Sequence, residues 1–156
     1  FLFKEKENPR KLNISEIKKI QEIEVCDYNN LKAGRDFTLS SGKTIQNSLL
    51  TLDPEKTMSY AYCSDTSYKP DIVEIIKGSD ILYHESTFLS DKEDLAIKTR
   101  HSTAKQAAVI AKKAEVKKLI LGHYSSRYKD ISLFKKEAEE IFTNVILAET
   151  GKIISI

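Results

Sequence analysis

Apolar residues recur at helical spacing in four stretches of the chain. Within residues 13–23 every third position from Ile14 is apolar, and Asn13 or Ser15 can cap a helix there. The alanine-rich stretch 101–116 has Ser102 or Thr103 in the capping position. The pattern predicts helices within residues 13–23, 69–80, 101–116 and 131–142.

Short apolar runs between these stretches favour β-strands. Residues 36–52 are typical of two strands joined by a turn, and residues 144–156 of a hairpin around Thr150 and Gly151. Single strands are expected within residues 1–3, 58–64, 80–88 and 116–123. Because strands then alternate with helices over most of the chain, we predict a layered α/β fold and treat residues 1–156 as a single unit.

Composition narrows the class of protein only slightly. Forty per cent of the 156 residues are hydrophobic, enough for the core of one domain, and a net charge of +2 neither requires nor excludes a nucleic-acid partner. No apolar run approaches the length of a membrane span. Cys26 and Cys63 form no CxxC pair, so we expect reduced thiols in the cytoplasm. Because the chain opens with Phe1 inside an apolar run, we expect a piece of a longer protein.

Chemically active side chains follow successive predicted strands. Asp65 comes after the strand within 58–64, His84 and Glu85 end the next one, His101 precedes the alanine-rich helix, and His123 ends the last strand of the series. In α/β sheets the carboxyl ends of parallel strands share one edge, where ligands bind. We therefore expect these side chains to converge, although each alone could be an ordinary polar residue at a strand exit.

A cluster of carboxylate and imidazole groups suits a metal ion such as zinc, manganese or iron. Asp65 and His123 are the candidate ligands, and His101 and Glu85 are acid/base candidates. Two ligands are fewer than the three protein ligands of a typical catalytic zinc, so the chain offers half a site.

The segment after His123 combines hydroxyl groups with a guanidinium. Ser125, Ser126 and Arg127 could bind a phosphate through hydroxyl donors and a forked, charge-assisted contact. The alternative is a solvated turn before the next helix. Their position beside metal-ligand candidates favours a phosphodiester substrate.

Four segments carry a family resemblance by their order and spacing. They are YCSDT (62–66), HESTF (84–88), HSTAKQAA (101–108) and GHYSSRY (122–128). Together they resemble the carboxyl-terminal half of ribonuclease Z, a metallo-β-lactamase-superfamily endonuclease that trims the 3′ end of precursor tRNA. The resemblance covers essentially the whole chain. It implies half of an αββα sandwich, with a mixed sheet that carries helices on one face.

The resemblance also implies a role for individual residues. Asp65 would bridge two zinc ions, and His123 would bind one of them. His101 would be the proton donor or charge stabiliser near the scissile phosphate, and Glu85, with His84, would hold it in its working tautomer. The RNA phosphates would be bound by Ser125, Ser126 and Arg127.

The main metal motif of the family, HxHxDH, does not occur in residues 1–156. We therefore expect a carboxyl-terminal fragment that is inactive alone and binds little or no zinc, whereas the intact enzyme would hold two zinc ions per subunit, act as a homodimer on precursor tRNA and have no membrane contact. Two alternatives stay open: a phosphodiesterase or arylsulfatase-like hydrolase of the same superfamily, and a non-catalytic interaction module.

Overall fold

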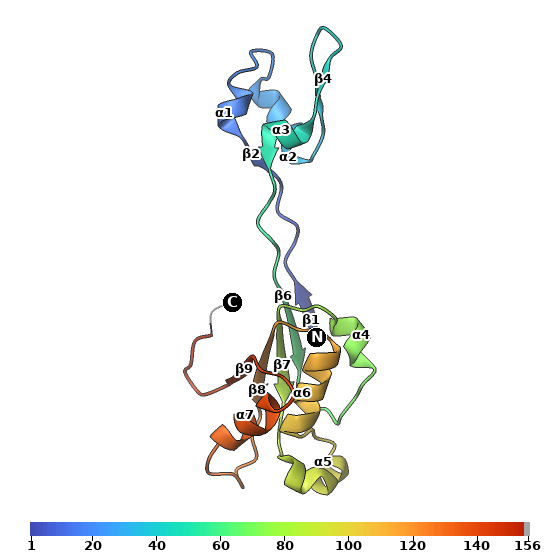
Figure 1. Cartoon of the computed structure of the whole chain (residues 1–156), viewed down its shortest axis with the longest axis vertical. Helices are drawn as coiled ribbons and strands as arrows, with labels where there is room; N and C mark the ends of the chain where they lie inside the picture. Colours follow the sequence, from blue (N-terminus) through green and yellow to red (C-terminus); the bar gives the residue numbers. More distant parts are fainter. Residues whose placement is uncertain (155–156) are drawn as a thin grey trace. The chain divides into compact units, whose positions relative to one another are not determined.

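The computed structural model describes residues 1–154 and forms two compact units (Figure 1). The sheet unit consists of Phe1–Glu5 and Met58–Ile156, and the insert unit of Lys6–Thr57. Each unit has its own cluster of buried apolar residues. The assignment of residues 1–156 to a single domain stays a prediction.

The sheet unit is built on five strands. They are β1 (Leu2–Lys4), β6 (Ser59–Cys63), β7 (Ile81–Glu85), β8 (Lys118–Gly122) and β9 (Val145–Leu147). They lie in the order β1-β6-β7-β8-β9, with β1 antiparallel to β6 and the other neighbours parallel. The predicted mixed sheet is confirmed.

Helices connect the parallel strands of this unit. The connecting helices are α4 (Ile72–Ile76), α6 (Ala104–Lys113) and α7 (Ser132–Glu139). Because successive parallel strands are neighbours and such crossovers are right-handed, the three helices cover the same face of the sheet. An unpredicted helix, α5 (Glu93–Thr99), follows the 3₁₀ turn η2 (Ser90–Lys92) in the connection between β7 and α6.

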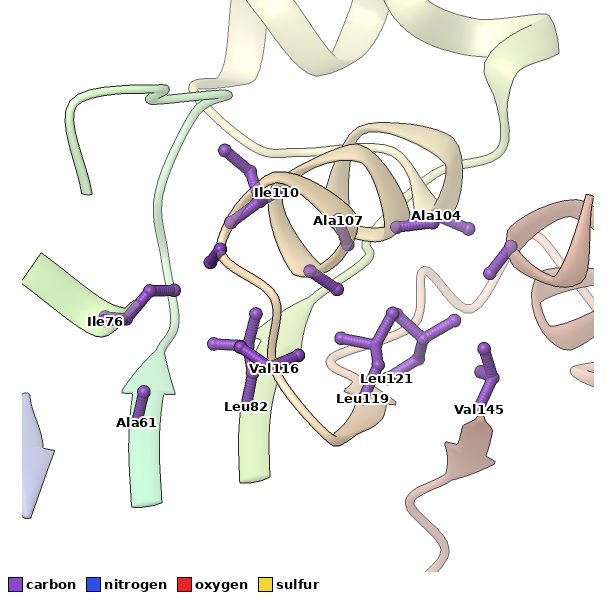
Figure 2. Close-up of a cluster of buried hydrophobic side chains, with 14 of the residues drawn as sticks. Ala61, Ile76, Leu82, Ala104, Ala107, Ile110, Val116, Leu119, Leu121 and Val145 are labelled. Carbon is purple, nitrogen blue, oxygen red and sulfur yellow. The ribbon is translucent and has the colours of Figure 1, made fainter. Parts of the chain in front are cut away.

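The core lies between this face and α6 (Figure 2). Ala61, Leu82, Leu119 and Val145 are paired in register across four strands, so their side chains point to the same side. All four are buried in one cluster with the alanine-rich face of α6, whose small side chains let the helix lie close to β7 and β8. The first turn of α6 is closed by a capping box between Thr103 and Gln106, as the sequence predicts for the cap.

The opposite face of the sheet carries a row of aromatic rings. Phe3 stacks on Tyr60, and Tyr62 stacks on Tyr83 with 4.8 Å between ring centroids. Phe3 is 57% exposed, which is unusual for a phenylalanine in a strand. This face therefore has apolar surface that the three connecting helices do not cover.

The insert unit is made of short elements around Ile17, Ile23, Leu31 and Leu50. Its elements are β2 (Lys11–Leu12), α1 (Ile14–Ile17), η1 (Val25–Asp27), α2 (Tyr28–Lys32), β3 (Phe37–Thr38), β4 (Thr44–Ile45), α3 (Asn47–Leu50) and β5 (Thr51–Leu52). Strands β3 and β4 form the expected antiparallel pair, and β5 pairs with β2.

Two predictions for the insert unit are wrong in extent. The helix expected over 13–23 ends at Ile17, because the chain then tightens into three-residue turns that bring Ile23 into the small core. The second strand expected within 36–52 is interrupted by α3. There the Asn47 amide donates to two main-chain carbonyl oxygens, those of Leu31 and Arg35, each at 2.8 Å. These tertiary hydrogen bonds override the strand pattern.

The predicted terminal hairpin is only partly present. Strand β9 forms, and a turn closes where Lys152 N donates to Glu149 O at 3.1 Å. Residues 152–154 form no strand, and residues 155–156 lie outside the described part of the chain.

Asp80, directly before β7, is expected to make the stability of the fold depend on pH in the acid range. The Asp80 carboxylate accepts from the main chain and hydroxyl of Ser59, both at 2.8 Å, and pairs with Lys117. The hydrogen bond from Lys117 lowers the pKa of Asp80 to about 2 from its ordinary 3.8. This stabilisation is therefore complete above about pH 4 and lost as the pH falls from about 4 to about 2.

Asp80→Asn should lower the free energy of unfolding at neutral pH by about 1–2 kcal/mol, because Lys117 is half exposed. It should also flatten the dependence of stability on pH below about pH 4. Urea unfolding at several pH values measures both effects. Asp71→Asn, at an exposed position, is the control. If stability depends on pH in Asp80→Asn as it does in the unsubstituted chain, the proposed contribution of the Asp80 carboxylate is wrong.

Candidate functional site

The predicted site residues converge at one edge of the sheet. Asp65 follows β6, Glu85 ends β7, and His123 follows β8, so three adjacent parallel strands deliver them to the same edge. His101 arrives from the loop between α5 and α6. Ligand atoms of Asp65, His101 and His123 lie within 4.8 Å of one another.

The backbone is bent sharply at two of these positions. Asp65 has φ 49° and His123 has φ 60°, a left-handed conformation that non-glycine residues rarely adopt. Such conformations cost free energy and are enriched at functional sites, although the chain also adopts them at Arg100 and Glu115. Here they bring Asp65 Oδ1 to 3.3 Å from His123 Nε2.

Glu85 is the centre of the site's hydrogen-bond network. Its side chain is completely buried. Oε1 accepts from His101 Nδ1 at 2.8 Å and from the amide of Thr66 at 2.7 Å. Oε2 accepts from the hydroxyl of Thr87 at 2.7 Å, and more weakly from the amides of Thr87 and Ser102. The carboxylate thus joins the loops after three separate elements.

These contacts decide the charge of Glu85. Burial raises the pKa of the carboxyl group, but the hydrogen bonds from Thr87, His101, Ser102 and Thr66 outweigh that effect, and the pKa is lowered overall. Glu85 is therefore an ionised acceptor at neutral pH.

His101 is held by this carboxylate. Because Glu85 Oε1 accepts from Nδ1, the second nitrogen, Nε2, is left without a proton in the neutral ring. The ring lies beside His123, with 5.2 Å between centroids, and keeps 24% of its side-chain surface exposed. This geometry suits a group that exchanges a proton at Nε2.

His84 lies on the other side of the strand, toward the helices. It is completely buried, and its Nδ1 is 2.7 Å from the main-chain oxygen of Glu85. Burial lowers the pKa of His84, so the ring is neutral, and its Nε2 has no hydrogen-bond partner among the described residues. Among the described residues His84 and His101 form no hydrogen bond with each other, and a catalytic role for His84 stays a prediction.

Thr87 was not among the predicted site residues. Its hydroxyl lies between Glu85 Oε2 and His123 Nδ1, at 2.7 Å and 2.9 Å respectively. The sequence could have indicated Thr87 as a site residue, because it lies two positions after Glu85 and alternate residues of an extended segment point to the same side.

The predicted phosphate-binding residues form the loop beside this network. Ser125 N donates to the main-chain oxygen of Thr87 at 3.0 Å, which fixes the loop next to His123. Arg127 Nη1 reaches Ser125 Oγ at 3.4 Å, and Ser126 and Arg127 are exposed. The loop therefore presents hydroxyl and guanidinium donors to solvent near the site, and phosphate binding stays a prediction.

The donor set fits a divalent metal. Carboxylate oxygen and imidazole nitrogen are ligands that zinc accepts, and second-partner hydrogen bonds of the imidazoles, here to Glu85 and Thr87, are usual in metal sites. The described residues bring at most three such ligand atoms together at this edge.

In the part of the chain that the structure describes, no helix has the length and apolar character needed to cross a membrane. Cys26 and Cys63 are both free thiols.

Comparison with known proteins identifies relatives along the whole chain. No protein-family model matches. Ribonuclease Z of Bacteroides thetaiotaomicron is 44% identical over 156 residues, which are 100% of this chain and 49% of that protein. Ribonuclease Z of Phocaeicola vulgatus is 46% identical over 154 residues, 98% of this chain and 50% of that protein. The chain thus spans about half the length of the curated relatives it matches.

Solved structures agree on the fold. The metallo-β-lactamase fold protein YhfI of Bacillus subtilis matches with a TM-score of 0.57 and 26% identity, over 61% of this chain and 39% of that chain. A long-form RNase Z from yeast matches with a TM-score of 0.55 and 28% identity, over 62% of this chain and 13% of that chain. Along its whole length the chain is similar to about half of ribonuclease Z, and it has the mixed sheet and helices of the metallo-β-lactamase fold.

Proposed function

We propose that this chain supplies part of the active site of a zinc-dependent endoribonuclease that removes the 3′ trailer from precursor tRNA. The observation that carries the proposal is the convergence of Asp65, His101 and His123 around the buried carboxylate of Glu85. The sequence similarity to ribonuclease Z over the whole chain supports the choice of substrate.

Asp65 and His123 would hold the metal, since their ligand atoms lie 3.3 Å apart. A bound zinc centre would supply Lewis-acid stabilisation of the phosphate and an activated water. His101 would then carry the proton that the leaving 3′ oxygen receives, at its Nε2, while Glu85 stabilises the protonated ring from the Nδ1 side. The nearby Ser125, Ser126 and Arg127 would hold RNA phosphates.

The 156-residue chain alone is expected to be inactive and to bind zinc weakly or at one position. Its cluster offers few ligands, fewer than a two-metal centre requires. The test compares this chain with a ribonuclease Z protein of full length that contains it, using precursor tRNA and a small chromogenic phosphodiester. We expect zinc-dependent trimming at the 3′ side by the longer protein only.

Each other outcome contradicts a named part of this proposal. Full-rate cleavage by the 156-residue chain would contradict the expectation that this chain holds only part of the metal site. Cleavage of the small diester but not of precursor tRNA would favour a phosphodiesterase of the same fold. A longer protein that contains no metal would favour an interaction module.

We also propose that the protein is cytoplasmic and that the longer protein is a homodimer, each on a single observation. The two free thiols support a cytoplasmic protein, because such cysteines persist in reducing compartments. A homodimer is carried over from the family resemblance alone. Sedimentation of the longer protein would test the dimer.

A further inference from the structure

We propose that Thr87 is a positioning residue that fixes His123 in the tautomer with the proton on Nδ1, so that Nε2 presents a lone pair beside Asp65. The reason for such a tautomer, which is to bind a metal ion, rests on the function proposed above. The tautomer itself follows from hydrogen-bond geometry within this chain.

The argument begins with the hydroxyl group of Thr87, which has a single proton to donate. Two partners lie within hydrogen-bond distance, Glu85 Oε2 at 2.7 Å and His123 Nδ1 at 2.9 Å. The hydroxyl can donate to one of them and must accept from the other. Which one it donates to sets the tautomer of His123.

Glu85 can only accept in this environment. Three main-chain amides, those of Thr66, Thr87 and Ser102, point at its two oxygens, and an amide N–H can only donate. They stabilise the ionised carboxylate, whose pKa is lowered overall, and an ionised Glu85 has no proton to donate. The Thr87 hydroxyl therefore donates to Glu85.

It follows that the same hydroxyl accepts from His123, so Nδ1 carries the proton and Nε2 does not. Asp65 Oδ1 lies 3.3 Å from that Nε2. Two lone-pair donors at this separation repel unless a positive charge lies between or beside them. The two lone pairs therefore suit a bound cation. The tautomer that provides the His123 lone pair is set by Thr87, which bonds to the opposite nitrogen of the ring.

Thr87 is well placed to transmit this constraint. Its side chain is buried, its amide contacts Glu85, and its carbonyl oxygen accepts from the amide of Ser125 at 3.0 Å. One carboxylate thus orients both imidazoles: Oε1 binds His101 directly, and Oε2 reaches His123 through Thr87. The Thr87 contact has the form of the outer hydrogen bonds that orient metal-binding histidines.

Nitrogen-15 NMR of the metal-free 156-residue chain tests the tautomer directly, at about pH 8.5, where imidazoles are neutral. With only three histidines, His84→Gln and His123→Gln variants assign the signals. We expect His123 to carry its proton on Nδ1. In Thr87→Val, which keeps the shape and removes the hydroxyl, we expect His123 to shift toward the Nε2-protonated form while His101 keeps its tautomer.

Zinc ions added alone give the second measurement. Thr87→Val should weaken zinc binding by about 10–100-fold, the usual effect of losing such a partner, and Thr87→Ser should restore both tautomer and affinity. Thr99→Val is the control, because among residues 1–154 the Thr99 hydroxyl bonds only to carbonyl oxygens of its own helix, those of Leu95 and Ala96.

An Nε2-protonated His123 in the unsubstituted chain would overturn the proposal, even if Thr87→Val does not fold. An unchanged tautomer in a folded Thr87→Val would overturn it as well. Because the NMR measurement needs neither metal nor RNA, a failure of the proposed nuclease activity leaves this test independent.

Discussion

Replacing Glu85 with glutamine is expected to lower the free energy of unfolding by about 2–4 kcal/mol. The side chain is fully buried and accepts from five donors. An amide of the same shape turns one acceptor oxygen into a donor group, which must then face groups that donate to the carboxylate in the unsubstituted chain. The loops that carry Thr66, Thr87 and Ser102 would lose a shared anchor.

Urea unfolding followed by circular dichroism measures this loss. Glu74→Gln, in an exposed position on α4, is the control and should change stability by less than about 0.5 kcal/mol. Equal stability of Glu85→Gln and the unsubstituted chain would show that the carboxylate network contributes little to folding.

The second large effect concerns the two histidines that meet at the site. In a longer ribonuclease Z protein that contains this chain, His101→Ala should reduce cleavage of precursor tRNA by about 10²–10⁴-fold while the metal content stays unchanged. The reason is that His101 is bound to Glu85 through Nδ1, and in the proposed mechanism it would carry a proton at Nε2.

His123→Ala in the same protein should reduce metal content and activity together, because His123 Nε2 lies beside Asp65. Metal analysis of both purified variants, with single-turnover cleavage rates, separates the two roles. Loss of metal in His101→Ala would reassign that residue as a ligand. Full activity in His123→Ala would remove it from the site.

The amino-acid pattern by itself determined the sheet unit closely. The alternation of apolar runs predicts β6, β7 and β8, and the alanine-rich stretch predicts α6 with its cap. These elements have regular periods and clear end signals, so local sequence is sufficient. Because parallel strands end at one edge, the same pattern also predicts the convergence of Asp65, His101 and His123, which the structure shows.

Elsewhere tertiary contacts decided the outcome. The helix α3 begins at Asn47, whose amide donates to carbonyl oxygens of residues distant in sequence, and the helix expected within 13–23 is cut short by the geometry of a small core. Both effects depend on residues that are distant in sequence, so the local spacing of apolar residues could not predict them.

Within the site, the sequence by itself determined which side chains gather, and only the tertiary structure decided which atoms meet. Neighbouring residues of a strand point to opposite sides, so Glu85 faces the site while His84 faces the helices. The link from Glu85 through Thr87 to His123 depends on strand register and on the left-handed backbone at His123. The approach of Asp65 to His123 Nε2 also depends on the left-handed backbone at Asp65. Hydrogen bonds act over a few ångströms and at defined angles, so they exist only once the whole sheet edge has been assembled.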